Sequence, residues 1–128
     1  MRLLLDTCTF LWVVTGDRAL SQRARELVSD PGHGAFLSFA SAWEISVKYG
    51  LGKLVLPAAP DEYVAGARER HRISPLPLSE AACLKVHRLP PLHRDPFDRM
   101  LVCQALTEGM TIVTPDPQIR QYAVPTEW

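Results

Sequence analysis

The sequence predicts an α/β fold in which a mostly parallel central sheet is covered by helices on both faces. Short apolar runs alternate with helical segments along the chain, and 47% of the residues are apolar, enough for a real core. Strands that alternate with helices typically form a parallel sheet with helices on each side. The length of 128 residues suits one compact domain, so we expect residues 1–128 to form a single domain.

The predicted strands are short and mostly apolar. They cover residues 2–5 (RLLL), 35–38 (AFLS), 73–78 (ISPLPL), 110–114 (MTIVT) and 123–126 (AVPT). The prolines in 73–78 argue against a central strand, because proline cannot donate to the hydrogen-bond ladder of a sheet. We therefore expect 73–78 to be an edge strand or an extended connection, and 123–126 to add a strand only at an edge.

Helices are predicted between these strands, at residues 8–14, 21–30, 40–50, 61–71, 79–89 and 96–109. Ser21, Asp61 and Ser79 are placed to cap helix N-termini, because a side-chain oxygen at that position accepts from a free backbone N–H. Gly50 and Gly109 are placed where helices end. These signals set the predicted boundaries.

Charge and composition argue against several classes of protein. Fourteen Lys and Arg residues balance fourteen Asp and Glu residues, so binding to nucleic acid through bulk charge alone is not expected. No apolar run approaches the ~20 residues that cross a bilayer, and the first residues lack the apolar stretch of a signal peptide. We therefore expect a cytoplasmic protein without membrane association.

The cysteines and histidines show no metal-binding spacing. Cys8, Cys83 and Cys103 lie in apolar segments without a C-x-x-C pair, which favours buried free thiols over disulfides or zinc. None of the four histidines pairs with a carboxylate at the spacing of a zinc helix. We assign none of these residues to a metal.

The stretch HRDPFDRMLVCQAL, residues 93–106, places two aspartates three positions apart just before an apolar helix. Helix capping alone accounts for this pattern. Asp95 suits the N-cap, Pro96 suits the first helical position, and Asp98 faces the positive end of the helix dipole. A functional interpretation of Asp98 therefore depends on whether other acidic residues converge on it.

Acidic residues do follow the predicted strands, at the sheet edge where parallel α/β proteins have their functional crevice. Asp6 follows the first strand directly, Glu44 lies in the first turns of the helix after the second strand, Asp98 lies in the first turn of its helix, and Asp116 follows the fourth strand by two residues. Each could individually be an ordinary turn, cap or surface residue. Together they would repel one another unless a cation lay between them. Oxygen ligands suit Mg²⁺ or Mn²⁺, so we predict such a site, with Asp95 left as a cap and at most a minor ligand.

The motifs LLLDTCTFLW, SFASAWEISVKYGLGKL, HRDPFDRMLVCQAL and TIVTPD, in this order and spacing, resemble the PIN-domain ribonucleases, and among them the VapC-type toxins of bacterial toxin–antitoxin pairs. The resemblance extends from residue 2 to about residue 125. It implies a PIN-like, Rossmann-like sheet with strand order 3-2-1-4-5. It also implies metal ligation by Asp6, Glu44, Asp98 and Asp116, the last directly or through water. The hydroxyls of Thr7 and of Ser38 or Thr114 are implied to support the site.

The activity implied by this resemblance is that of a metal-dependent endoribonuclease. One or two cations would activate water to hydrolyse a phosphodiester bond of RNA. Lys48, Arg94 and Arg99 lie near the acidic residues in the sequence and are expected to guide RNA, although Arg99 could instead pair with a local acid. A cognate antitoxin is the implied partner, and we expect a homodimer or a hetero-oligomer with that antitoxin.

Other small α/β classes remain as alternatives. A magnesium-binding receiver-like module would need a late lysine, and this chain has none after position 85. A phosphatase with an aspartyl nucleophile typically has a second acid two residues after the first, where this chain has Cys8. A non-catalytic interaction module of the same shape would not need the acids. The choice among transfer, ribosomal and messenger RNA stays open.

Overall fold

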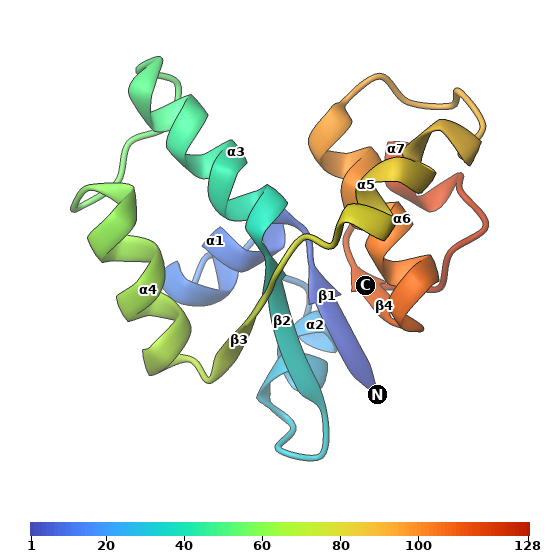
Figure 1. Cartoon of the computed structure of the whole chain (residues 1–128). Coiled ribbons are helices and arrows are strands. Elements are labelled where there is room, and N and C mark those ends of the chain that lie inside the picture. The colour runs from blue at the N-terminus through green and yellow to red at the C-terminus, as the bar shows by residue number, and fades with distance from the viewer.

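A five-stranded parallel sheet runs through the computed structural model, which describes residues 1–128 (Figure 1). The strands are β1 (Arg2–Leu5), β2 (Gly34–Ser38), β3 (Ile73–Leu76), β4 (Thr111–Val113) and β5 (Thr126–Glu127). They lie in the order β3-β2-β1-β4-β5, and all neighbours pair in parallel. The α/β class and the strand order 3-2-1-4-5 are therefore confirmed, with 73–78 contributing an edge strand.

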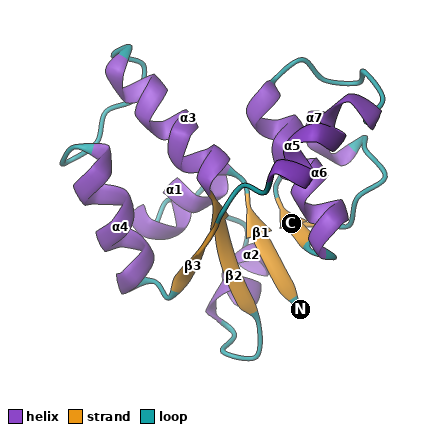
Figure 2. Ribbon diagram, viewed as in Figure 1, coloured by secondary structure: helices purple, strands orange, loops and turns teal.

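Helices surround this sheet (Figure 2). They are α1 (Thr7–Thr15), α2 (Gln22–Ser29), α3 (Phe39–Gly50), α4 (Pro60–Arg70), α5 (Glu80–Lys85), α6 (Pro96–Glu108) and α7 (Pro117–Arg120), with a 3₁₀ turn, η1 (Val86–Arg88), after α5. The ribbon separates α3 and α4 on one side from α5, α6 and α7 on the other, with the ends of the central strands between them.

Alternation along β1 explains the two layers of helices. Leu3 and Leu5 are buried in a core formed with α1, α2 and α4, whereas Leu4 is buried in a second core formed with α6 and α7. Successive side chains of a strand point to opposite faces, so a strand buried on both faces is apolar at consecutive positions. The RLLL run therefore belongs to a central strand.

The register of the sheet brings the chain segments after three strands to one edge. Leu5 of β1 pairs with Leu37 of β2 on one side and with Val113 of β4 on the other. The three strands therefore end at nearly the same level. Asp6 and Thr114 follow their strands directly, and α3 begins at the end of β2.

The helix caps follow the sequence prediction except in α4. Ser21 and Ser79 accept from the backbone N–H groups of Ala24 and Ala82, as predicted. Asp61 was expected to cap α4, but the N-cap is Ala59, and Asp61 lies in the first turn after Pro60. Proline at the first helical position moves the helix start forward, and Asp61 then faces the positive end of the dipole instead.

Other expectations are also corrected. The helix predicted at 79–89 stops at Lys85 and continues as the η1 turn, and the short helix α7 was not predicted. Cys103 is buried as expected, whereas Cys8 and Cys83 are free cysteines in exposed positions, with the Cys8 thiol itself partly buried. None of the helices is both long enough and apolar enough to span a bilayer.

Candidate active site

Asp6 lies at the end of β1, and only 5% of it is exposed. Its Oδ1 accepts from the backbone N–H of Thr9 at 2.8 Å, which caps α1. Its Oδ2 accepts from the hydroxyl of Thr114, the residue after β4. Burial raises the pKa of this carboxyl above its ordinary value, although both hydrogen bonds oppose the shift. A buried carboxylate that accepts hydrogen bonds from α1 and from the residue after β4 is thus fixed in position.

Glu44 lies on the second turn of α3 and is 4% exposed. The hydroxyl of Thr7, at the start of α1, donates to its Oε1 at 2.6 Å. Lys48, one helical turn further along, donates from Nζ to its Oε2 at 2.5 Å. This hydrogen bond, which Lys48 donates to Glu44, raises the pKa of Lys48 above its ordinary value. Glu44 therefore joins α3 to the segment that carries Asp6.

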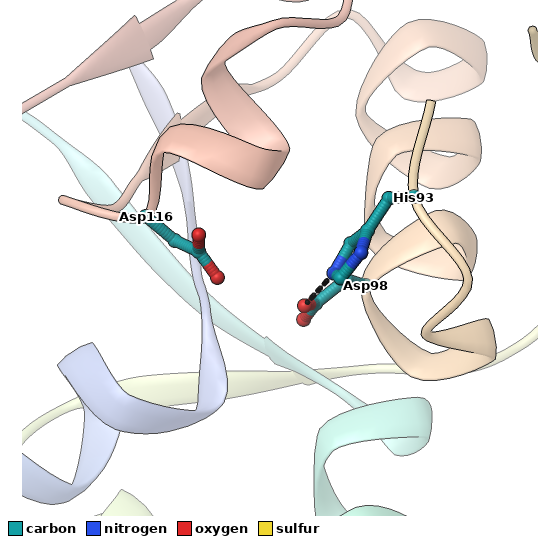
Figure 3. A group of neighbouring side chains, drawn as sticks. All are labelled: His93, Asp98 and Asp116. Carbon is teal, nitrogen blue, oxygen red and sulfur yellow. Dashed lines mark hydrogen bonds and ion pairs between the residues drawn. The ribbon is translucent and has the colours of Figure 1, made fainter. Parts of the chain in front are cut away.

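Asp98, His93 and Asp116 form a compact group at the same edge (Figure 3). One ligand atom from each residue lies within 4.8 Å of the others. His93 precedes α6 and bonds through Nε2 to the Asp98 Oδ2 at 2.9 Å. Asp116, the N-cap of α7, faces Asp98 across the gap. Two oxygen ligands and one nitrogen ligand from three segments thus point at one place.

The pKa of Asp98 is raised from 3.8 to about 6. Burial is the largest cause, the hydrogen bond from His93 opposes it, and the negative charges of Asp95, Glu44 and Asp6 add to it. The charge of Asp116 acts in the same way on Asp6. The carboxylates of Asp6, Glu44 and Asp95 thus add to the negative charge around Asp98, after the larger effect of burial.

Cys8 provides an independent probe of the same place. Its pKa is raised first by burial and then by the charges of Asp6, Glu44 and Asp98, with Lys48 opposing them. The field around this thiol is therefore negative. Two carboxylates with raised pKa values, Asp6 and Asp98, and a single neighbouring ammonium fit a divalent cation, since such an ion favours the ionised form of both.

The predicted supporting residues differ in where the structure places them. Thr7 and Thr114 donate directly to Glu44 and Asp6. Ser38 does not reach an acid: its hydroxyl donates to the side-chain oxygen of Gln104 and caps α3 through the N–H of Ala40. The Ser38 expectation is corrected, because Ser38 lies at the N-cap and its hydroxyl is used there.

Asp95 occupies the N-cap of α6. Its Oδ1 accepts from the backbone N–H groups of Phe97 at 2.8 Å and of Asp98 at 3.1 Å. The carboxylate therefore fixes the first turn that carries Asp98, as the capping interpretation expects. Its charge still contributes to the field at Asp98.

The basic residues expected to guide RNA separate into three cases. Arg94 is exposed beside His93. Lys48 is paired with Glu44 at the rim of the acidic group. The guanidinium of Arg99 is used inside the protein: it donates to the Tyr122 hydroxyl and, in the segment before α6, to the backbone carbonyls of Val86, Leu89 and Pro90. Arg99 thus pairs with no local acid, and its role is to hold that segment against α6.

His93 is a residue that sequence reasoning missed. The expectation that no histidine lies at the metal site is not supported, because His93 is one of the clustered ligand groups. Its distance of five residues from Asp98 fits no helical spacing, and it lies in a loop before α6. The only available signal was its presence in the HRDPFD motif.

The chain was also compared with known proteins. The family model of the PIN domain matches residues 3–125. Ribonuclease VapC16 from Mycobacterium tuberculosis is 42% identical over 57 residues, which are 44% of this chain and 40% of that protein. The matched segment therefore spans less than half the length of this curated relative.

Solved structures share the fold at low sequence identity. A chain of VapBC2 from Rickettsia felis, bound to a DNA fragment from their promoter, superposes with a TM-score of 0.73 at 16% identity, covering 99% of this chain and 98% of that one. A chain of VapBC-1 from nontypeable Haemophilus influenzae gives a TM-score of 0.64 at 16% identity, covering 99% and 97%.

Proposed function

The chain belongs to the PIN-domain family, and from this premise we propose that it is a divalent-cation-dependent endoribonuclease, the toxin of a toxin–antitoxin pair. The proposal rests mainly on the placement of Asp6, Glu44, Asp98 and Asp116 at one sheet edge. The charges of Glu44 and Asp6 act on Asp98, that of Asp116 acts on Asp6, and Asp98 and Asp116 lie close together. The ribonuclease name of the Mycobacterium tuberculosis relative supports the reaction class. A receiver-like module is not favoured, because the family match extends over almost the whole chain.

The donor set fits Mg²⁺ or Mn²⁺ as the cofactor. Asp98 and Asp116, which cluster with His93, would hold the cation directly or through water. Asp6 and Glu44 are proposed as further ligands, and their charges act on Asp98. Carboxylate oxygens are the ligands that these ions prefer. When bound, the cation would supply charge neutralisation at the phosphate and the acidity that activates water near neutral pH.

The residues of the chain itself do the positioning. Thr7 and Thr114 fix the orientation of Glu44 and Asp6, and His93 fixes that of Asp98. In the proposed reaction, a water oxygen bonds to phosphorus and the bond from phosphorus to the 3′ oxygen breaks. The leaving 3′ oxygen takes a proton, so the products carry a 5′-phosphate and a 3′-hydroxyl. The 2′-hydroxyl takes no part in this chemistry.

A partner protein is part of the proposal. A ribonuclease acting in the cytoplasm would damage its own host, so a cognate antitoxin would have to cover the acidic site. The concentration of negative charge here favours a cationic side chain in that role. The two neighbouring structures are of VapBC pairs, which supports this class of partner. Assembly as a homodimer, or as a hetero-oligomer with the antitoxin, remains part of the proposal.

The test is to replace Asp6 or Asp98 by asparagine. We expect each variant to lose at least ~100-fold in Mn²⁺-dependent cleavage of single-stranded RNA, because each change removes a charge that holds the cation. The measurement is the cleavage rate of a labelled RNA, with EDTA as the metal-free reference and with product ends mapped. Circular dichroism establishes that both variants fold.

Asp61→Asn serves as the matched control, because Asp61 is an exposed aspartate on α4 that belongs to no acidic cluster. It is expected to cleave RNA at the wild-type rate. Full activity in either site variant, or wild-type cleavage that EDTA leaves unchanged, would overturn the proposed function.

A further inference from the structure

An exposed tryptophan, Trp43, packs against the partly buried ring of Phe97. Trp43 is 60% exposed, although it lies in the first half of a well-packed helix. Its ring meets that of Phe97 edge to face, with centroids 5.0 Å apart and an interplanar angle of 81°. This geometry is a favourable aromatic contact, so the indole is held in place without being buried.

The pair joins the two helices that carry acids of the site. Trp43 immediately precedes Glu44 on α3, and Phe97 immediately precedes Asp98 on α6. The two helices contact each other, and the ring pair of Trp43 and Phe97 is one of these contacts. The pair is therefore one residue from Glu44 and Asp98 along the backbone, although consecutive side chains of a helix point in different directions.

An apolar cavity of about 220 Å³ adjoins the pair. Besides Trp43 and Phe97, its lining includes Leu78, Val86 and Met100, and no charged side chain lines it. Its volume is below the roughly 300 Å³ at which pockets begin to hold drug-sized molecules. The volume and the apolar lining suit a small, flat, uncharged group, whereas a charged phosphate would find no charged partner there.

We propose that Trp43, Phe97 and this cavity form a subsite for one unpaired base of the RNA substrate, adjacent to the phosphate that is cleaved. Unpaired RNA bases are typically recognised by stacking on aromatic side chains. The inference rests on the proposed ribonuclease function and adds to it that Trp43 determines base preference. In this proposal the ring of Trp43 is the aromatic surface on which the base stacks, and the sequence pattern alone did not reveal it.

A protein partner is the competing occupant, since Trp43 continues a stripe of exposed apolar residues along α3. That stripe includes Phe39, Val47 and Leu51. None of these three residues lines the cavity, whose other walls come from α5, η1, α6 and the segment before α5. Trp43 is therefore the one residue of the stripe that lines the cavity, and the lining of the cavity by α3 and α6, the helices that carry Glu44 and Asp98, favours a base.

The test uses Trp43→Ala and Trp43→Phe in the full chain, with a random pool of single-stranded RNA and Mn²⁺. Sequencing of the product ends gives the base frequencies around each cut. We expect the wild type to prefer particular bases at one position beside the cut. Trp43→Ala should lose the preference at that position alone and lower kcat/KM about tenfold or more, and Trp43→Phe should retain part of both.

Tyr49→Ala is the matched control, because Tyr49 is an exposed aromatic residue on the same helix that does not line the cavity. It should retain both the preference and the rate. The Mn²⁺ affinity of Trp43→Ala, measured by calorimetry, should equal that of the wild type, which separates base binding from damage to the acidic site.

The outcomes distinguish the two proposals. Wild-type rate and preference in Trp43→Ala would overturn the base subsite and leave the nuclease intact. If that variant instead failed only to bind a co-expressed antitoxin, Trp43 would belong to a protein interface. Absence of any metal-dependent cleavage by the wild type would overturn the nuclease, and the base subsite with it.

Discussion

Burial of Asp98 destabilises the folded protein only while the Asp98 carboxyl is ionised. The pKa of this group is 3.8 in an unfolded chain and about 6 in the folded one, chiefly because it is buried. Between these values the folded state holds the proton more tightly, so stability falls as pH rises through that range. Above about pH 6 the full penalty is present in the metal-free protein.

We therefore predict that Asp98→Asn stabilises the metal-free protein at pH 7 by about 1 kcal/mol, a value reduced for partial exposure of the group. The gain should vanish below about pH 3, under both pKa values, where the carboxyl is protonated in both states. Urea unfolding in EDTA at the two pH values measures it. A variant that is no more stable than the wild type at pH 7 would contradict the burial argument.

Residue types in the sequence predicted the acids but not their neighbours. Asp6, Glu44, Asp98 and Asp116 were identifiable because each follows a strand or begins a helix at one sheet edge. His93 was not identifiable, because it acts from a loop where no periodicity applies. Trp43 and Phe97 meet only when α3 and α6 pack together, and no local pattern reports that contact.

At the scale of elements, the side chain of Arg99 makes several of the hydrogen bonds that hold the segment before α6. Arg99 donates to three backbone carbonyls between Val86 and Pro90 and to the hydroxyl of Tyr122. This segment contains η1 and leads into the loop that carries His93. An arginine can satisfy several carbonyls at once because its donors lie in a fixed planar fork.

Arg99→Ala is expected to lower the free energy of unfolding by about 2 kcal/mol, since several carbonyls lose a charged donor. Arg94→Ala is the control: Arg94 is exposed, and its guanidinium has no partner within the chain, so its loss should change stability by less than about 0.5 kcal/mol. Urea titration of both variants measures the difference. Equal stability of the two variants would show that the hydrogen bonds of Arg99 do not stabilise the folded protein.

The sequence predicted the helix boundaries well where one capping residue determines the boundary. Ser21, Ser79 and Asp95 cap the helices they were expected to cap, and Gly109 ends α6 in a left-handed conformation. Prediction failed where two signals compete, as at Pro60 and Asp61 of α4. The end of α5 depends on contacts with α6, including the hydrogen bond from Arg99 to the carbonyl of Val86. These are tertiary contacts, which local sequence signals do not predict.

At the scale of the molecule, the register of the sheet brings the residues of the candidate site to one edge. Because Leu5, Leu37 and Val113 are paired, the segments that follow β1, β2 and β4 meet at one edge. Alternation of strands and helices predicted a parallel sheet, but it did not determine the strand order. The prolines of 73–78 predicted an edge position for that segment, but the full order came from the family resemblance, because the choice of neighbouring strands depends on long-range packing.

The central claim is that carboxylates distant in the sequence hold one divalent-cation site. The most direct measurement is the anomalous scattering of a crystal grown with Mn²⁺. We predict a manganese peak among the side chains of Asp6, Glu44, Asp98 and Asp116, and loss of that peak in Asp98→Asn. A wild-type crystal in which manganese binds elsewhere, with these carboxylates contacting no ion, would contradict the claim.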